Sequence, residues 1–237
     1  MKKFPAGLVF WLVLLIVSPA AAAYIETFPA NNAGWQYGTI KDSGEVTLDE
    51  ATWQETGGNG FIVQAASSAT NRLYGYQADN VALFGELAGM ILTVDLQLTG
   101  SINAYAGAEP MVRFYIGSSI DENSINYFVS NDSFSWNPNG VAGWQSHQVP
   151  LVAANFLRWP NADTGDKTFD QVLASANDIG LFFTHASTTF EIFPSLGFYG
   201  EGAAVAIDNF GTVVPLPTAI FLLGAGLIRL ALSQRRQ

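Results

Sequence analysis

The stretch Met90–Leu98, which reads MILTVDLQL, decides the fold class because apolar and polar residues alternate along most of it. The apolar side consists of Leu92, Val94, Leu96 and Leu98, and the polar side of Thr93, Asp95 and Gln97. Successive side chains of a β-strand point to opposite faces of its sheet. We therefore expect a strand with one face in a core and the other face toward solvent.

Similar short runs follow along the chain and are divided by clusters of Gly, Asn, Asp, Ser or Pro, which mark turns. The runs are 111–116, 126–129, 145–151, 179–184 and 203–213. Many short strands favour an all-β fold, a two-sheet antiparallel β-sandwich of the jelly-roll type. No internal repeat or linker divides residues 24–213, so we expect one domain there.

One short helix is predicted near residue 170. The sequence Thr168-Phe169-Asp170-Gln171 has the pattern of a capping box, with Thr168 as the N-cap and Gln171 three positions later. The apolar stripe that follows consists of Phe169, Val172, Leu173 and Ala176. A helix of about nine residues with this single apolar face would cover one end of a sheet.

The composition excludes several classes of function. The chain of 237 residues has no cysteine, so it has neither a disulfide framework nor a cysteine nucleophile. Its net charge of -10 at pH 7 argues against nucleic-acid binding, which clustered Lys and Arg residues drive. All 20 acidic residues lie between Glu26 and Asp208, whereas five of the ten basic residues lie near the two ends. The chain is therefore an acidic body between two apolar, basic-flanked ends.

Residues 1–23 have the pattern of a secretory signal peptide. Lys2 and Lys3 precede an unbroken apolar run, Leu8–Val17, which is far shorter than the ~20 residues that span a bilayer as a helix. Ala21 and Ala23 then provide the small residues of a cleavage site before Tyr24. We expect export through the inner membrane and removal of this segment.

Residues 214–237 form a different kind of end. The proline motif consists of Val214, Pro215, Leu216 and Pro217. Thr218–Leu232 is then apolar except for Arg229, and Arg235 and Arg236 stand in the closing tail. An apolar segment followed by arginines fits a transmembrane helix with a cytoplasmic tail, with the body on the other side. An ordinary core helix would be expected to have a polar face, which this stretch lacks.

This order of proline motif, apolar segment and basic tail resembles the PEP-CTERM sorting signal, with VPLP as a variant of its Pro-Glu-Pro motif. The glutamate of the motif is absent, and Arg229 interrupts a rather short apolar segment. The resemblance implies processing by an exosortase, a membrane cysteine protease-transpeptidase of Gram-negative bacteria. It also implies transient anchoring in the inner membrane and delivery to the cell surface or beyond, in lineages that make exopolysaccharide and biofilm.

The body resembles laminin B-type (laminin IV) domains. The similar stretches are Glu26–Phe28, Gly34–Trp35, Gly143–Gln145, Phe169–Leu173, Ile179–Leu181 and Ala206–Phe210. These domains belong to the galactose-binding-like jelly rolls, which include many carbohydrate-binding modules. The resemblance implies the fold more than the ligand, because a fold alone does not define a function.

Glu26 and Asp208 are candidate ligands of a structural Ca²⁺. The first and last strands of such jelly rolls often lie side by side, which the resemblance extends to this chain. Ca²⁺ takes about six to eight oxygen ligands, some of which carboxylates at two strand ends could supply. Alternatively, both residues are solvated edge carboxylates, with Asp208 starting a turn or accepting an Asx hydrogen bond.

Aromatic side chains are candidates for stacking on sugar rings. They are Trp35, Trp53, Trp136, Trp144, Trp159, Tyr74, Tyr76 and Tyr199. Indoles are mostly core or interface groups, and Trp144 begins an alternating strand, so we expect it in the core. Trp136 lies in the loop-like stretch Ser133–Pro138, where it either contacts a glycan or simply packs against the protein.

The sequence holds no G-x-S-x-G, H-E-x-x-H or phosphate-loop motif, and His147 and His185 are readily strand residues. We therefore expect no enzyme but an exported, non-catalytic surface or extracellular-matrix protein. Two alternatives stay open. One is a carbohydrate-binding module for exopolysaccharide or another surface glycan, and the other is a polysaccharide hydrolase, which needs only two suitably placed carboxylates.

Overall fold

The computed structural model describes residues 24–57, 59–66, 68–78, 80–104, 109–119, 125–131, 134–135, 143–159, 165–185 and 196–215. The predicted signal peptide, Trp136 and the tail from Leu216 onward, with Pro217, Arg235 and Arg236, lie outside these residues.

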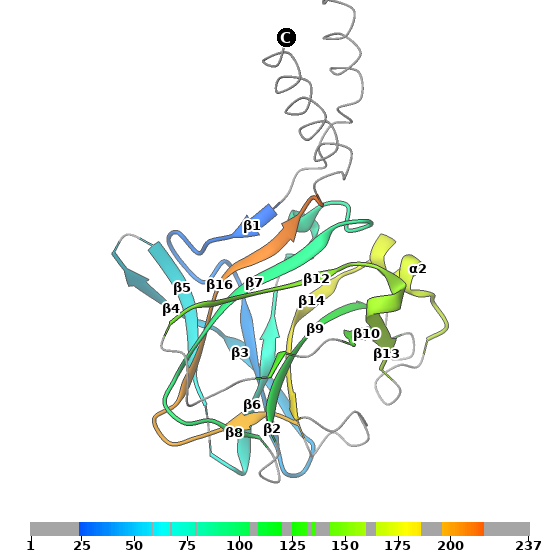
Figure 1. Ribbon diagram of the computed structural model, residues 1–237. Helices are drawn as coiled ribbons and strands as arrows, with labels where there is room; N and C mark the ends of the chain where they lie inside the picture. The colour runs from blue at the N-terminus through cyan, green and yellow to red at the C-terminus, as the bar shows by residue number, and fades with distance from the viewer. Residues whose placement is uncertain are drawn as a thin grey trace, which may run out of the picture.

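The described residues form two antiparallel sheets that pack face to face (Figure 1). The six-stranded sheet has the order β12 (Gln145–Pro150), β7 (Ile91–Thr99), β16 (Ala204–Val213), β5 (Asn59–Ala65) and β4 (Thr52–Thr56), with β1 (Tyr24–Glu26) also paired to β16. The ten-stranded sheet has the order β13 (Phe156–Arg158), β10 (Ile125–Ser130), β9 (Pro110–Ser119), β14 (Asp178–His185), β6 (Asn71–Gln77), β15 (Phe198–Tyr199) and β8 (Asn103–Ala104). In addition, β11 (Phe134–Ser135) pairs with β9, β2 (Gln36–Lys41) with β6, and β3 (Val46–Glu50) with β2. The predicted all-β sandwich is confirmed.

The alternating stretch that predicted the fold lies in β7, the neighbour of β16. Leu92, Val94 and Leu96 are buried in the core, and Asp95 and Gln97 on the opposite face are partly exposed. The other predicted runs lie in β9, β10, β12, β14 and β16. The five strands between residues 36 and 77 were missed because they lack this pattern; β3, for example, is exposed along its whole length.

The predicted helix is present as α2 (Phe169–Ala174), which contacts β9 and β10. Its capping box is complete: the backbone N–H of Gln171 donates to Thr168 Oγ1, and the backbone N–H of Thr168 donates to Gln171 Oε1 at 2.7 Å. The helix is shorter than expected because Ser175 leaves the helical backbone conformation. Two 3₁₀ helices, η1 (Val81–Phe84) and η3 (Ala153–Asn155), complete the described elements.

Phe210 on β16 lies at the centre of the aromatic part of the core. Its ring centroid is 4.8 Å from that of Trp35, 5.8 Å from that of Phe84 and 6.1 Å from that of Phe114. These rings come from the segment before β2, from η1 and from β9 of the opposite sheet. Edge-to-face contacts of this kind stabilise a core beyond the apolar area that they bury.

The strand β16 changes its partner in the middle of its length. Ala204–Ile207 pairs with β5, and Phe210–Thr212 pairs with β1. The register against β7 shifts between Asp208 and Gly211, where Asn209 has a φ of 50°, a left-handed conformation that Asn tolerates better than most residues. Gly211 is required beyond this bulge, because a Cβ there would lie 2.1 Å from the carbonyl oxygen of Tyr24.

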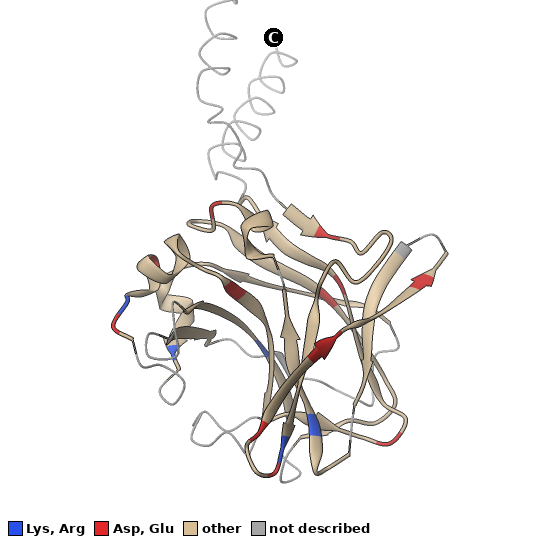
Figure 2. Cartoon of the chain, turned by 180° about the vertical axis from the view of Figure 1, so that it is seen from behind, with Lys and Arg blue, Asp and Glu red and all other residues tan. Residues whose placement is uncertain are grey.

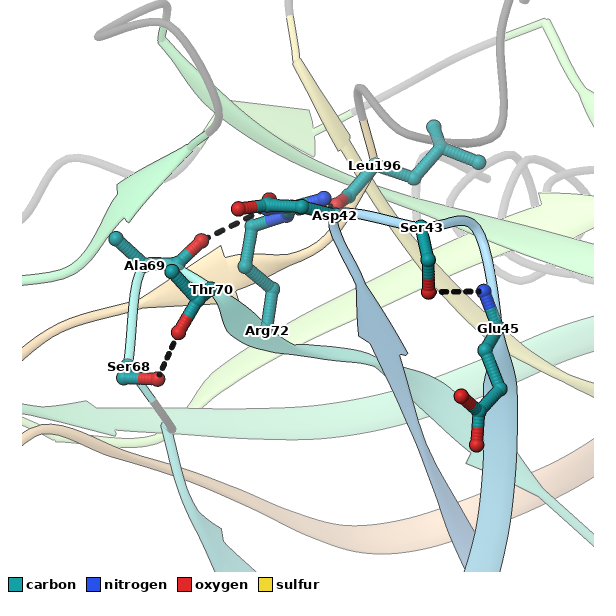
Figure 3. A network of polar contacts seen from close by, with 8 residues as sticks. All are labelled: Asp42, Ser43, Glu45, Ser68, Ala69, Thr70, Arg72 and Leu196. Atoms are coloured by element: carbon teal, nitrogen blue, oxygen red, sulfur yellow. Dashed lines mark hydrogen bonds and ion pairs between the residues drawn. The ribbon is translucent and has the colours of Figure 1, made fainter.

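A buried arginine joins the turns at the opposite end of the sandwich (Figure 3). Arg72 Nε donates to the carbonyl oxygen of Leu196 at 2.7 Å, and Nη1 donates to the carbonyl oxygen of Ala69 at 2.8 Å and to Asp42 Oδ1 at 2.5 Å. The Arg72 side chain is fully buried, whereas that of Asp42 is mostly exposed. Arg72 thus supplies donors to carbonyls of two segments that are far apart in the sequence.

We expect Arg72→Met to lower the free energy of unfolding by about 2–4 kcal/mol, because the carbonyls of Leu196 and Ala69 lose their donor. Urea unfolding measures the loss. Lys41→Met, which breaks the exposed ion pair between Lys41 and Glu45, is the control and should cost less than about 0.5 kcal/mol. Equal losses in the two variants would show that Arg72 has no such role.

Candidate functional site

The outer face of the six-stranded sheet carries the strongest candidate site among the described residues. In the strand register Ser146 of β12 lies opposite Asp95 of β7, and Asp95 lies opposite Asp208 of β16. Trp144 precedes β12, and Phe61 lies on β5. We call Trp144, Phe61, Asp95, Ser146 and Asp208 the outer-face site.

The sequence analysis placed Trp144 in the core, and this prediction is wrong: the residue is 41% exposed. Its ring contacts that of Phe61 edge-to-face, with 5.5 Å between the centroids. The reason is the strand frame: Val149 is buried in the core, so Gln145 and His147 share its side of β12 and Trp144 falls on the other side. Counting back in twos from Val149 would have found this exposed indole in the sequence.

Asp95 and Asp208 are held together by hydrogen bonds around the bulge of β16. Asn209 donates its backbone N–H to Asp208 Oδ1 at 2.7 Å and its side-chain Nδ2 to Asp95 Oδ2 at 2.7 Å. Ser146 Oγ donates to Asp95 Oδ1. Like charges directly opposite each other destabilise a sheet, so these donors offset a repulsion that the register creates. The alternative in the sequence analysis, a solvated edge carboxylate with an Asx hydrogen bond, does not describe Asp208: the side chain is buried, and its backbone bond goes to the next residue rather than to the residue two positions on.

The pKa of Asp208 lies above its ordinary value of 3.8. Burial of the carboxylate is the main cause, and the charges of Asp95 and Glu26 raise the pKa further, while the hydrogen bond from Asn209 opposes the shift. A buried carboxylate whose pKa is raised by neighbouring charges is a feature of functional sites as well as of structural networks.

The predicted ligand pair is only partly brought together. Glu26 lies opposite Phe210, on the core side of the sheet, whereas Asp208 lies opposite Asp95 on the outer side. Both carboxylate oxygens of Glu26 already accept hydrogen bonds, from Tyr24 Oη at 2.6 Å and from the backbone N–H of Phe28 at 2.9 Å. The described residues contain no group of three or more acidic or histidine side chains that could hold a metal ion. A structural Ca²⁺ at Glu26 and Asp208 stays a prediction.

The other aromatic candidates among the described residues mostly pack within the protein. Trp35 and Tyr76 are buried in the core, and Trp53 donates its Nε1–H to the carbonyl oxygen of Phe28 at 2.8 Å. Trp159 and Tyr74 belong to a second apolar cluster, in which the two rings contact Phe182. Trp144 is therefore the candidate with the exposure that stacking on a ligand needs.

The second apolar cluster lies on the outer face of the ten-stranded sheet and surrounds Asp178. Its members are Tyr115, Val129, Trp159, Phe182 and Leu196, with Tyr74 and Tyr127 packed against them. Tyr115 Oη donates to Asp178 Oδ1 at 2.8 Å, and Tyr127 Oη donates to Asp178 Oδ2. Burial raises the pKa of Asp178, and the two hydroxyl donors lower it. Because both oxygens are bonded within the cluster, we interpret it as packing rather than a binding site.

The outer-face site combines the exposed ring of Trp144, packed on the half-buried Phe61, with polar groups that donate and accept hydrogen bonds. Ser146, Gln148 and Gln54 are exposed on the same side of the sheet. Hydroxyl and amide groups both donate and accept, so these three side chains can bind the polar groups of a ligand. Both oxygens of Asp95 already accept hydrogen bonds and Asp208 is buried, so the aspartates shape the site rather than contact a ligand. This arrangement suits a ligand with an apolar face and a rim of hydroxyl groups.

Of the residues predicted for processing, the structure describes Tyr24, Val214 and Pro215, which lie at the edge where β1 and β16 pair. Tyr24 is the first residue of β1 and lies opposite Thr212, and Val214 and Pro215 follow the last residue of β16. Val214 is exposed. No helix within the described ranges is long and apolar enough to cross a bilayer.

The strand pairing and this site define a two-sheet antiparallel β-sandwich with one open, aromatic and acidic sheet face. No protein-family model matches the chain, and no curated protein matches it. Among solved structures it is similar to the L4b domain of human laminin alpha-2, with 9% identity over 83% of this chain and 99% of that one, and a TM-score of 0.43. So low a likeness adds nothing to the fold that the strand pairings already define.

We expect Asp208→Asn to stabilise the protein at neutral pH. A carboxyl group whose folded-state pKa is raised costs stability progressively as pH rises from its ordinary value of 3.8 through the raised pKa. The variant lacks this loss, while its amide oxygen can still accept the hydrogen bond from Asn209. The unfolding free energies of the wild type and the variant, measured from about pH 3 upward, should therefore agree at acid pH. They should diverge toward about pH 7, where the variant has the higher free energy of unfolding.

Asp49→Asn, which removes an exposed carboxylate from β3, is the control for loss of a negative charge. A wild-type protein more stable than Asp208→Asn at neutral pH would contradict the burial cost assigned to Asp208.

Proposed function

We propose that this chain is an exported, non-catalytic surface or extracellular-matrix protein with a jelly-roll body. A signal peptide at 1–23 directs export, and the segment 214–237 acts as a PEP-CTERM-like sorting signal. An exosortase-type transpeptidase processes it at the inner membrane of a Gram-negative bacterium. The body is then displayed or released, in association with exopolysaccharide or biofilm.

The observation that supports this proposal is the position of the two described ends. Tyr24 lies directly opposite Thr212, so the chain enters and leaves the sandwich at the same edge (Figure 1). Both predicted membrane segments can therefore be engaged at one membrane without unfolding the body. Val214 and Pro215, the described residues of the proposed sorting segment, are exposed, as an address that is cut from the body requires.

The tail should be removed in the native host. We expect intact-mass measurement to show a protein that begins at Tyr24 and lacks Gln237. Replacing both Arg235 and Arg236 by Gln should leave an unprocessed precursor in the membrane fraction, because the positive tail that orients the segment is lost.

A double change of Gln234 and Gln237 to Ala keeps the charge of the tail and is the matched control. Secretion of a chain that retains Gln237 would refute the sorting role.

Glycan binding is the second candidate function, and the exposed Trp144, whose ring packs on the half-buried Phe61, favours it. The C–H groups of a sugar ring are apolar on one face and can pack on an indole, while its hydroxyl groups bond to amide and hydroxyl groups nearby. The outer-face site offers both kinds of contact. Because the body is strongly acidic, we propose a neutral polysaccharide rather than an anionic one as the ligand.

We expect Trp144→Ala to weaken retention on an affinity gel of isolated exopolysaccharide by about tenfold or more, the effect of losing ~1.4 kcal/mol of contact energy. The cost to folding should be smaller than for a core tryptophan, because 41% of the residue is exposed. Leu48→Ala removes a similarly exposed apolar side chain from β3 and should leave retention unchanged.

Unchanged retention of Trp144→Ala beside lost retention of Trp136→Ala would move the binding site to the loop that the sequence analysis favoured. Release of soluble sugar from the gel would instead indicate the hydrolase alternative.

A further inference from the structure

We propose that one end of the sandwich lies directly against the lipid bilayer while the chain is anchored there, and this inference rests on the proposed membrane segment at 218–232. We call this surface the uncharged end. It consists of the exposed side chains of Ile25, Leu83, Val152 and Val214, together with the backbone turns that carry them.

Strand pairing brings the four segments of the uncharged end together. Val213, the residue before Val214, lies opposite Ile91 of β7, and Ile91 lies opposite Pro150 of β12, two positions before Val152. On the other side of β16, Tyr24 packs its ring against Phe84 of η1 with 5.2 Å between the centroids. Ile25 and Leu83 are the chain neighbours of these two rings and point outward.

The surface at this end suits a bilayer interface because it is apolar and almost free of charge. Glu86 is the only charged residue in the segments 24–25, 80–90, 150–155 and 213–215. Asn80, Ala82, Ala88, Ala153 and Ala154 are the smaller exposed residues between the apolar side chains. A protein surface that contacts lipid gains by burying apolar side chains in the interface and avoids buried carboxylates.

The opposite end has the reverse character. Lys41 ends β2, the turn that follows carries Asp42 and Glu45, and the turn before β16 carries Glu201. Figure 2 shows blue and red segments gathered at this end, the one farthest from β1. Negative charge there is held away from the phosphates of a membrane when the uncharged end faces it.

The length of the chain between the sandwich and the apolar segment leaves little room for another arrangement. Pro215 is the last described residue, and Thr218 begins the apolar stretch three positions later. A fully extended chain covers at most about 3.6 Å per residue, so these steps span roughly 11 Å. With 218–232 in the bilayer, Pro215 lies within this distance of the interface, and the end of β16 at Val213, five positions before Thr218, lies within roughly 18 Å of it. This short connection holds the side chains around Val214 close to the lipid.

Because the chain has no cysteine, single-cysteine variants can test this contact. Leu83→Cys places a fluorescent NBD label at the uncharged end, and Leu48→Cys places it on β3. Leu48 is the matched control for Leu83, because the exposed fractions of the two residues are 49% and 48%. Ala225→Cys places the label in the middle of the proposed membrane segment. Each labelled full-length chain is reconstituted into phosphatidylcholine vesicles with and without doxyl-labelled lipid, which quenches NBD on contact.

We expect doxyl lipid to quench the labels at positions 225 and 83 and to leave the label at position 48 unchanged. Quenching at 225 with none at 83, or equal quenching at 83 and 48, would overturn the proposed contact while the membrane segment stands. Absence of quenching at 225 would refute the membrane segment itself, and the contact with it. Near-ultraviolet circular dichroism that matches the unlabelled chain shows that each variant is folded.

Discussion

The bulge at Asn209 is the constraint on which the arrangement of this molecule depends. It lets a single strand, β16, close the sheet against β5 over its first half and accept β1 beside its second half. It also lets Phe210 reach the aromatic core and aligns Asp208 with Asp95 on the outside. One left-handed residue, a conformation that Asn adopts at modest cost, thus sets the core packing, the acidic pair and the pairing of β1 with the end of β16.

The two sheets use their outer faces differently. On the ten-stranded sheet, Asp178 is covered by tyrosines and by Trp159, so polar and apolar groups are satisfied within the protein. On the six-stranded sheet, the Asp95 and Asp208 carboxylates are fixed by Asn209 and Ser146, while Trp144 projects beside them into solvent. A face that keeps two like charges and an exposed indole gives up stability that a closed cluster would keep, which is why we propose this face for the second candidate function, glycan binding.

The sequence predicted those parts of the fold that a periodic pattern or a capping motif encodes. The alternation in β7 and the capping box of α2 were both found because burial and backbone bonding leave a regular trace in residue type. The strands from β2 to β6 left no such trace, since β3 is exposed throughout and β6 buries an arginine.

In the site, Asp208 was identified but Asp95 and Phe61 were not, because strand order and register join residues that no local pattern connects. Trp144 was assigned to the wrong face of the sheet, because the alternation of β12 was not counted from its buried residue Val149.

The pairing of the first strand with the last has a mechanical consequence. Tyr24 and Thr212 are the outermost partners of an antiparallel pair, so a pull that separates the two ends would load their backbone hydrogen bonds one after another, as in opening a zipper. Such a geometry resists force far less than shear along the strands. Such a surface protein would keep its fold under tension more easily if the force did not act between its first and last strands.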